Sequence, residues 1–162
     1  NYSSRRVDLH YYMLKKGKYL NNINFSKYYV NKFSPTIYNP RLYNLGCGPT
    51  TLSLLTGISP LKIKERKSYN DKFMVDFLNK LGYTCLTITK EDVSQIPLFI
   101  VYHIKPEHVV MISQLSIKSE ASWSVLYQKF LFHNFDIWEL QPLELLNRPL
   151  LSAYIIWHKK WV

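Results

Sequence analysis

Acidic residues and long apolar runs are both scarce in this sequence. It has 11 Asp and Glu residues against 21 Lys and Arg, which gives a formal net charge of +10. No window reaches the roughly 18 uninterrupted apolar residues that a membrane-spanning helix needs, and residues 1–6 lack the apolar core of a signal peptide. We therefore expect no membrane span, and an electrostatic preference for acidic partners. Because the basic residues are scattered in small groups, the charge pattern does not favour nucleic acid as the partner.

Cysteine is also scarce, and its spacing excludes two common kinds of site. The chain has two cysteines, Cys47 and Cys85, without a Cys-x-x-Cys pair, so we expect neither a structural zinc site nor a disulfide framework. Cys85 belongs to an alternating, β-branched run and is expected to be a small buried apolar residue. No cofactor motif is present, and we predict neither a cofactor nor a metal.

The length of 162 residues fits one domain with its own core. We expect an N-terminal arm or short helix over residues 1–37 and a single globular domain over 38–162. Because the chain begins with Asn1, we expect a processed protein or an excised domain, either cytoplasmic or released from a larger precursor.

Within the domain, helix signals precede strand signals. Residues 47–56 and 69–81 are expected to be helices, the first with proline in its first turn and glycine at its end. Strands are expected at the ranges 83–89, 96–102, 108–115, 125–132 and 151–157, with a polar connection at 116–124 and short helices at 7–14 and 142–147. This order predicts an α+β fold in which N-terminal helices pack on a mostly antiparallel sheet.

The most informative motif is Asn44-Leu45-Gly46-Cys47-Gly48-Pro49, which places a thiol between two glycines where a helix begins. The amides of a first helical turn are unpaired and carry partial positive charge. A thiol held there loses its proton more easily, and the thiolate is the nucleophile. The motif therefore favours nucleophilic acyl chemistry over a merely structural cysteine.

A thiol nucleophile needs a base and a group that orients the base. His108 opens a strand-like run, and Asp136 ends another, 28 residues later. We predict that Cys47 attacks, His108 transfers the proton and Asp136 orients His108. Asn134 is an alternative to Asp136, since residues two apart on a strand point the same way, whereas His133 is expected to face the opposite side of the strand.

These motifs together resemble a known family. The Cys-Gly-Pro-Thr-Thr helix, a second helix ending in Leu-Gly-Tyr, an Ile-Pro-Leu-Phe-Ile strand and the His-Val-Val-Met run are similar in order to papain-like cysteine peptidases, in particular those that remove double-glycine leaders from bacteriocins. The resemblance covers about residues 38–157. It implies a papain-like fold with the nucleophile at Cys47, the base at His108 and the orienting acid at Asp136.

One position departs from the family pattern. The family usually has glutamine six residues before the nucleophile, where it helps to form the oxyanion hole, and this chain has Arg41. Arg41, Asn44 and the amide at Gly48 are the candidate oxyanion donors.

The expected function is a cysteine peptidase or amidohydrolase that cleaves a peptide or isopeptide bond, as a processing peptidase or as the toxin or effector domain of a larger protein. Its expected partners are a peptide or protein substrate and an acidic inhibitor or immunity-type protein. The alternative is a catalytically weak, peptidase-like binding module for an acidic protein or nucleic acid.

Overall fold

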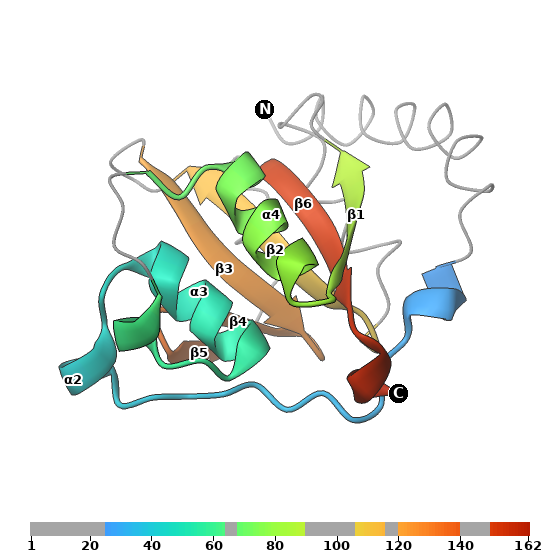
Figure 1. The fold of residues 1–162 in the computed structure, drawn as a ribbon, viewed down its shortest axis with the longest axis horizontal. Coiled ribbons are helices and arrows are strands. Elements are labelled where there is room, and N and C mark those ends of the chain that lie inside the picture. Colours follow the sequence, from blue (N-terminus) through green and yellow to red (C-terminus); the bar gives the residue numbers. More distant parts are fainter. Residues whose placement is uncertain (1–24, 64–67, 90–105, 116–119, 140–149) are drawn as a thin grey trace.

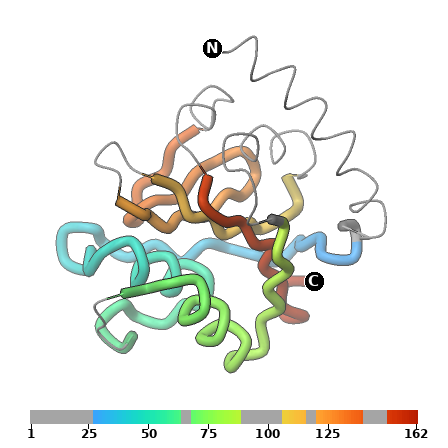
Figure 2. Tube along the Cα trace, turned by 90° about the horizontal axis from the view of Figure 1, so that it is seen from above, coloured from blue at the N-terminus to red at the C-terminus, as the bar shows by residue number. Residues whose placement is uncertain are grey.

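A computed structural model of the chain describes residues 25–63, 68–89, 106–115, 120–139 and 150–162. They form an α+β unit in which helices cover one face of a six-stranded antiparallel sheet (Figure 1). Viewed from above, the helices form one layer and the sheet forms another (Figure 2). The α+β class and the antiparallel sheet are thus confirmed. The elements predicted at 7–14, 96–102 and 142–147 lie outside the described residues.

The sheet has the strand order β1-β6-β2-β3-β4-β5, and every neighbouring pair is antiparallel. The predictions for 83–89, 108–115 and 151–157 are correct to within one residue. The strands are β1 (Thr84–Thr89), β2 (Val109–Leu115), β3 (Ala121–Tyr127), β4 (Phe130–His133), β5 (Asp136–Glu139) and β6 (Leu150–Trp157).

The segment predicted as one strand over 125–132 is instead a hairpin of β3 and β4. The chain turns at Gln128 and Lys129, which have φ values of 51° and 67°. Two consecutive positive φ values characterise the tight hairpin turn whose twist matches that of the flanking strands. Such turns normally carry glycine, asparagine or aspartate, so the sequence gives no signal here. The predicted connection at 116–124 was also wrong, because β3 begins at Ala121.

Asn134 and Phe135 form a second such turn, with φ values of 49° and 68°. This turn joins β4 to β5, so Asp136 begins a strand and does not end one. Asparagine tolerates the left-handed region because its short side chain can bond locally.

The two main helices are α3 (Cys47–Thr56) and α4 (Asp71–Lys80). Gly57 ends α3 in the left-handed conformation and its N–H donates to the Ser53 carbonyl. Asn70 caps α4, because its side-chain oxygen accepts from the Phe73 N–H at 2.9 Å. Both helix predictions are confirmed. The shorter helical segments are η1 (Phe25–Tyr28), α2 (Pro40–Tyr43), η2 (Pro60–Lys62) and η3 (Lys159–Trp161).

The core lies on both faces of the sheet. Val109 and Met111 of β2 belong to the larger cluster with the helices, whereas Val110 and Ile112 belong to a second apolar cluster. Successive residues of a strand point to opposite faces, so the second cluster lies on the face away from the helices. β2 is therefore buried on both faces, as befits a central strand.

Part of the predicted N-terminal arm belongs to this core. Val30 and Phe33 are buried, and the Val30 N–H donates to the Glu107 carbonyl at 3.0 Å. The carbonyl of Trp161 accepts from two further amides of the same segment. Residues 30–36 therefore fold with the domain.

A buried tyrosine joins α4 to the sheet, and its removal tests this packing. The Tyr154 hydroxyl donates to a carboxylate oxygen of Asp71 at 2.5 Å. We expect Tyr154→Phe to lower the free energy of unfolding by about 2 kcal/mol, since a hydrogen bond to a charged group is lost. Tyr127→Phe is the control, because its hydroxyl accepts a hydrogen bond from the side chain of the exposed Gln128 and from no charged group among the described residues. Equal denaturation midpoints for the two variants would contradict the expectation.

Candidate functional site

Cys47 is the first residue of α3, as the sequence predicts. Gly46 precedes it with φ of 102°, a conformation that other residues rarely adopt. The Asn44 side-chain oxygen accepts from the Gly46 N–H at 3.2 Å and so shapes the approach to the helix. The thiol is half-buried and packs against the edge of the main core.

The first turn of α3 is anchored through Gly48. A Cβ atom at Gly48 would lie 2.4 Å from Cγ of Tyr69, so glycine is required for this approach. The Tyr69 carbonyl in turn accepts from the Trp123 indole N–H at 2.6 Å. Trp123 lies near the start of β3, and Cys47 therefore lies at that end of the sheet.

A chain of polar contacts connects this helical turn to the β4–β5 turn. The Thr50 hydroxyl lies 2.9 Å from the Gly46 carbonyl, 3.2 Å from the Cys47 carbonyl and 3.3 Å from Oδ1 of Asn134, three acceptors that share its one proton. Nδ2 of Asn134 is 3.2 Å from Nε2 of His133, and Nδ1 of His133 is 3.1 Å from the Trp123 carbonyl. A carbonyl only accepts, so Nδ1 donates a proton to it. In the neutral imidazole this leaves Nε2 as the nitrogen that can take up a proton, as a general base must.

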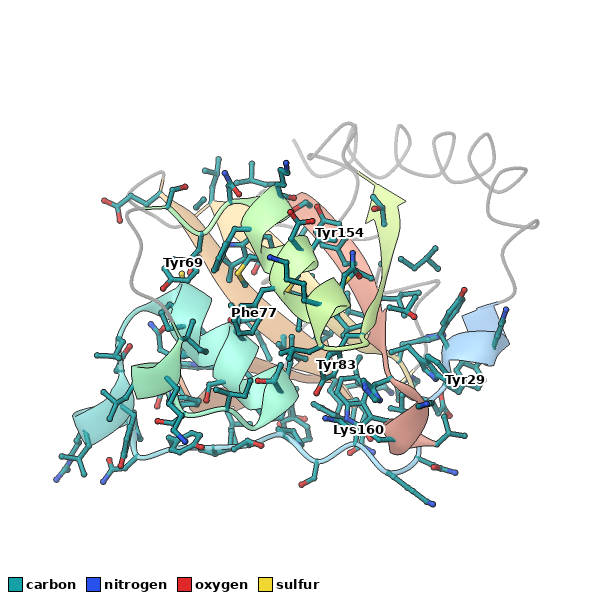
Figure 3. The ribbon with its side chains drawn as sticks, viewed as in Figure 1. Tyr29, Tyr69, Phe77, Tyr83, Tyr154 and Lys160 are labelled. Atoms are coloured by element: carbon teal, nitrogen blue, oxygen red, sulfur yellow. The ribbon has the colours of Figure 1, made fainter. Side chains whose placement is uncertain are left out.

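His108 lies at the other end of the sheet. It is 1% exposed, and its ring packs on Tyr29 with centroids 4.6 Å apart. In Figure 3, Tyr29 marks the position of His108 and lies far to the right. Tyr69 marks the position of Gly48, the neighbour of Cys47, and lies at the upper left. His108 directly precedes β2, and the start of β2 lies beside the end of β3, since Val110 pairs with Leu126. The structure therefore does not bring Cys47 and His108 together.

Asp136 is also distant from His108. It opens β5, is exposed, and faces His133 across the β4–β5 ladder. Two strands, β3 and β4, separate it from β2. The predicted orientation of His108 by Asp136 is thus not present in this structure. The alternative residue, Asn134, is the one that lies close to the Cys47 turn.

His133 lies beside the first turn of α3 through Asn134, and sequence reasoning did not select it. The strand pattern placed it on the face away from Asn134, and only the turn geometry shows that the two side chains meet. Its one sequence signal is the His-Asn dipeptide, an imidazole next to a residue that readily forms a tight turn.

The predicted oxyanion donors differ in their placement. Gly48 lies in the first turn of α3, where amides lack partners within the helix. Asn44 is adjacent to that turn, although its oxygen is engaged by Gly46. Arg41 is exposed in α2, where its N–H donates to the Asn39 side chain. The amide at Gly48 is therefore the best placed of the three.

Within the described ranges, no group of three or more His, Cys, Asp or Glu residues could hold a metal ion. The described helices are also all too short or too polar to cross a membrane.

Comparisons with protein families, with curated proteins and with solved structures find no match.

Substitution of Gly48 tests the anchor of the nucleophile helix. We expect Gly48→Ala to lower the free energy of unfolding by about 1–3 kcal/mol, because the new methyl group forces Tyr69 away from Trp123. Ser53→Ala on the same helix is the control. Its hydroxyl is buried with no partner among the described residues, so its removal is expected to be neutral or stabilising. If Gly48→Ala left the thermal unfolding of the protein unchanged, the close approach of Gly48 to Tyr69 would not be required for stability.

The two cysteines should differ sharply in reactivity. Burial raises the pKa of the Cys85 thiol to about 12, so it stays protonated at pH 8. We expect iodoacetamide at pH 8 to modify Cys47 and to spare Cys85 in the folded protein, as read by peptide mass spectrometry. Both should react at similar rates in denaturant. Equal modification of the two cysteines in the folded protein would contradict the raised pKa of the half-buried Cys85.

Proposed function

We propose that this protein is a cysteine hydrolase of the papain-like type, a peptidase or amidohydrolase with Cys47 as its nucleophile and His133 as its base. The observation that carries the proposal is the chain of contacts from His133 through Asn134 and Thr50 to the first turn of α3. The resemblance of the Gly-Cys-Gly-Pro helix and the following segments to leader peptidases supports the same reaction class.

Each group has a defined role in the reaction. The Cys47 sulfur attacks the carbonyl carbon of the scissile amide while its proton passes to Nε2 of His133. The first-turn amides of α3, including that of Gly48, donate to the oxyanion. His133 returns the proton to the leaving amine, and a thioester remains on Cys47. Water then hydrolyses the thioester, which releases the acid and restores the thiol.

His133 is assigned this role because of its position and its tautomer. The bond from Nδ1 to the Trp123 carbonyl fixes the ring and, in the neutral imidazole, leaves Nε2 to accept the proton. Nε2 accepts from the Asn134 amide in the resting protein, so this amide must move before proton transfer. Exchange of such a neutral hydrogen bond costs only about 1 kcal/mol. Catalytic contacts commonly tighten only when substrate binds.

Two matched histidine variants test the proposal. We expect His133→Gln to slow the alkylation of Cys47 by iodoacetamide about tenfold or more at pH 7, and His108→Gln to leave the rate unchanged. The rate is followed by mass spectrometry of the Cys47 peptide, and thermal unfolding confirms that both variants are folded. Slowing by His108→Gln alone would restore the predicted Cys47–His108 pair and overturn the present assignment.

A second candidate is a peptidase-like binding module without turnover. Two observations favour it: the separation of Cys47 from His108, and the formal net charge of +10. If neither histidine variant changes the Cys47 rate, the thiol is not activated by either imidazole and the binding module becomes the better account.

A further inference from the structure

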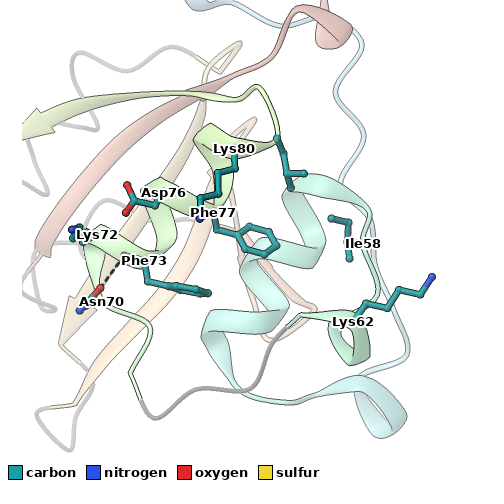
Figure 4. A pocket seen from close by; sticks show the side chains of 9 residues that line it. Ile58, Lys62, Asn70, Lys72, Phe73, Asp76, Phe77 and Lys80 are labelled. Carbon is teal, nitrogen blue, oxygen red and sulfur yellow. Dashed lines mark hydrogen bonds between the residues drawn. The ribbon is translucent and has the colours of Figure 1, made fainter.

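A groove on the outer side of the helical layer lies apart from the Cys47 site. It has a volume of about 650 Å³ and runs between α4 and the segment from Ile58 to η2 (Figure 4). Phe73 and Phe77 point from α4 into this space, and Ile58 lines the facing wall. All three side chains are only half-buried, so the groove offers apolar surface that water still reaches. None of its residues belongs to the proposed catalytic machinery.

The rim of the groove is basic. Lys72 and Lys80 come from the two ends of α4 and Lys62 comes from η2, and among the described lining residues Asp76 is the one acidic side chain. The two α4 lysines are eight residues apart, which corresponds to about 12 Å along the helix axis. A single carboxylate or phosphate group midway between them would lie beside the Asp76 carboxylate. A chain of acidic residues can place separate carboxylates at the two lysines, because an extended segment advances about 3.3–3.6 Å per residue.

We propose that this groove binds an acidic segment of a partner protein, with carboxylates on the three lysines and an apolar side chain on Phe73 and Phe77. The excess of basic residues over the whole chain would steer such a partner toward the protein. Apolar contact in the middle and charge pairs at the rim are the arrangement of ordinary protein interfaces. Asp76, between the two α4 lysines, disfavours a continuous run of phosphates, and so a polynucleotide is the weaker candidate.

The test uses a fluorescein-labelled synthetic peptide in which glutamates alternate with leucine and phenylalanine. Its binding is measured by fluorescence polarisation at low salt. Two control peptides replace the glutamates by glutamine or the apolar residues by alanine. We expect the first peptide to bind and each control peptide to bind about tenfold more weakly, since both charge and apolar contact contribute.

Matched charge reversals locate the binding site. The double variant Lys72→Glu/Lys80→Glu should weaken binding about tenfold or more, whereas Lys32→Glu/Lys159→Glu, an equal change in net charge at exposed positions outside the groove, should weaken it less than about threefold. The Cys47 alkylation rate should be unchanged in both double variants, so this result is independent of the hydrolase proposal.

Three outcomes would overturn the proposal. They are no binding of the acidic peptide to the wild-type protein, equal weakening by the two double variants, and tighter binding of oligothymidylate that depends on Lys72 and Lys80.

Discussion

The close approach of Gly48 to Tyr69 is the contact on which the arrangement of this protein depends. It brings the first turn of α3 against the residue whose carbonyl receives the Trp123 indole, and so fixes α3 over the start of β3. A larger residue at position 48 cannot occupy this place without a shift of Tyr69. The direction in which α3 crosses the sheet then decides which side chains surround Cys47. The contacts of the first turn of α3 run from Thr50 to Asn134 and from Asn134 to His133.

Local signals in the sequence predicted most of the regular structure. The Gly-Cys-Gly-Pro start and the glycine stop define α3, and the asparagine cap and apolar face define α4. The β-branched runs define β1, β2 and β6. These signals work because capping, proline geometry and strand alternation act over a few residues. The β3–β4 hairpin escaped prediction because Gln128 and Lys129 adopt positive φ without the residues that usually announce it.

The candidate site was predicted only in part. Cys47 at a helix start was expected and is observed, since this depends on neighbouring residues alone. Which histidine lies near the first turn of α3 depends on the direction in which α3 crosses the sheet. No local sequence pattern encodes that direction. Gly48 was expected to serve as an oxyanion donor, whereas its lack of a side chain also positions the whole helix. Long-range packing thus separated His108 from Cys47 and brought in His133, which strand alternation alone had set aside.

The helical layer offers two distinct surfaces. The N-terminal end of α3 presents the thiol and the polar contacts of the β4–β5 turn. The outer side of α4 presents an apolar groove with a basic rim. In the proposed account, the first surface carries out the chemistry and the second recruits an acidic protein, so one protein could act on a partner that it also holds.

The placement of Cys47 at the His133 end is the central claim, and a paramagnetic label tests it directly. A nitroxide attached to Cys47 broadens nearby proton resonances with a steep dependence on distance, and Cys85, whose raised pKa keeps its thiol protonated, should stay unlabelled. The account predicts strong broadening of the His133 imidazole resonances and little broadening of those of His108. Strong broadening of His108 with His133 unaffected would contradict it.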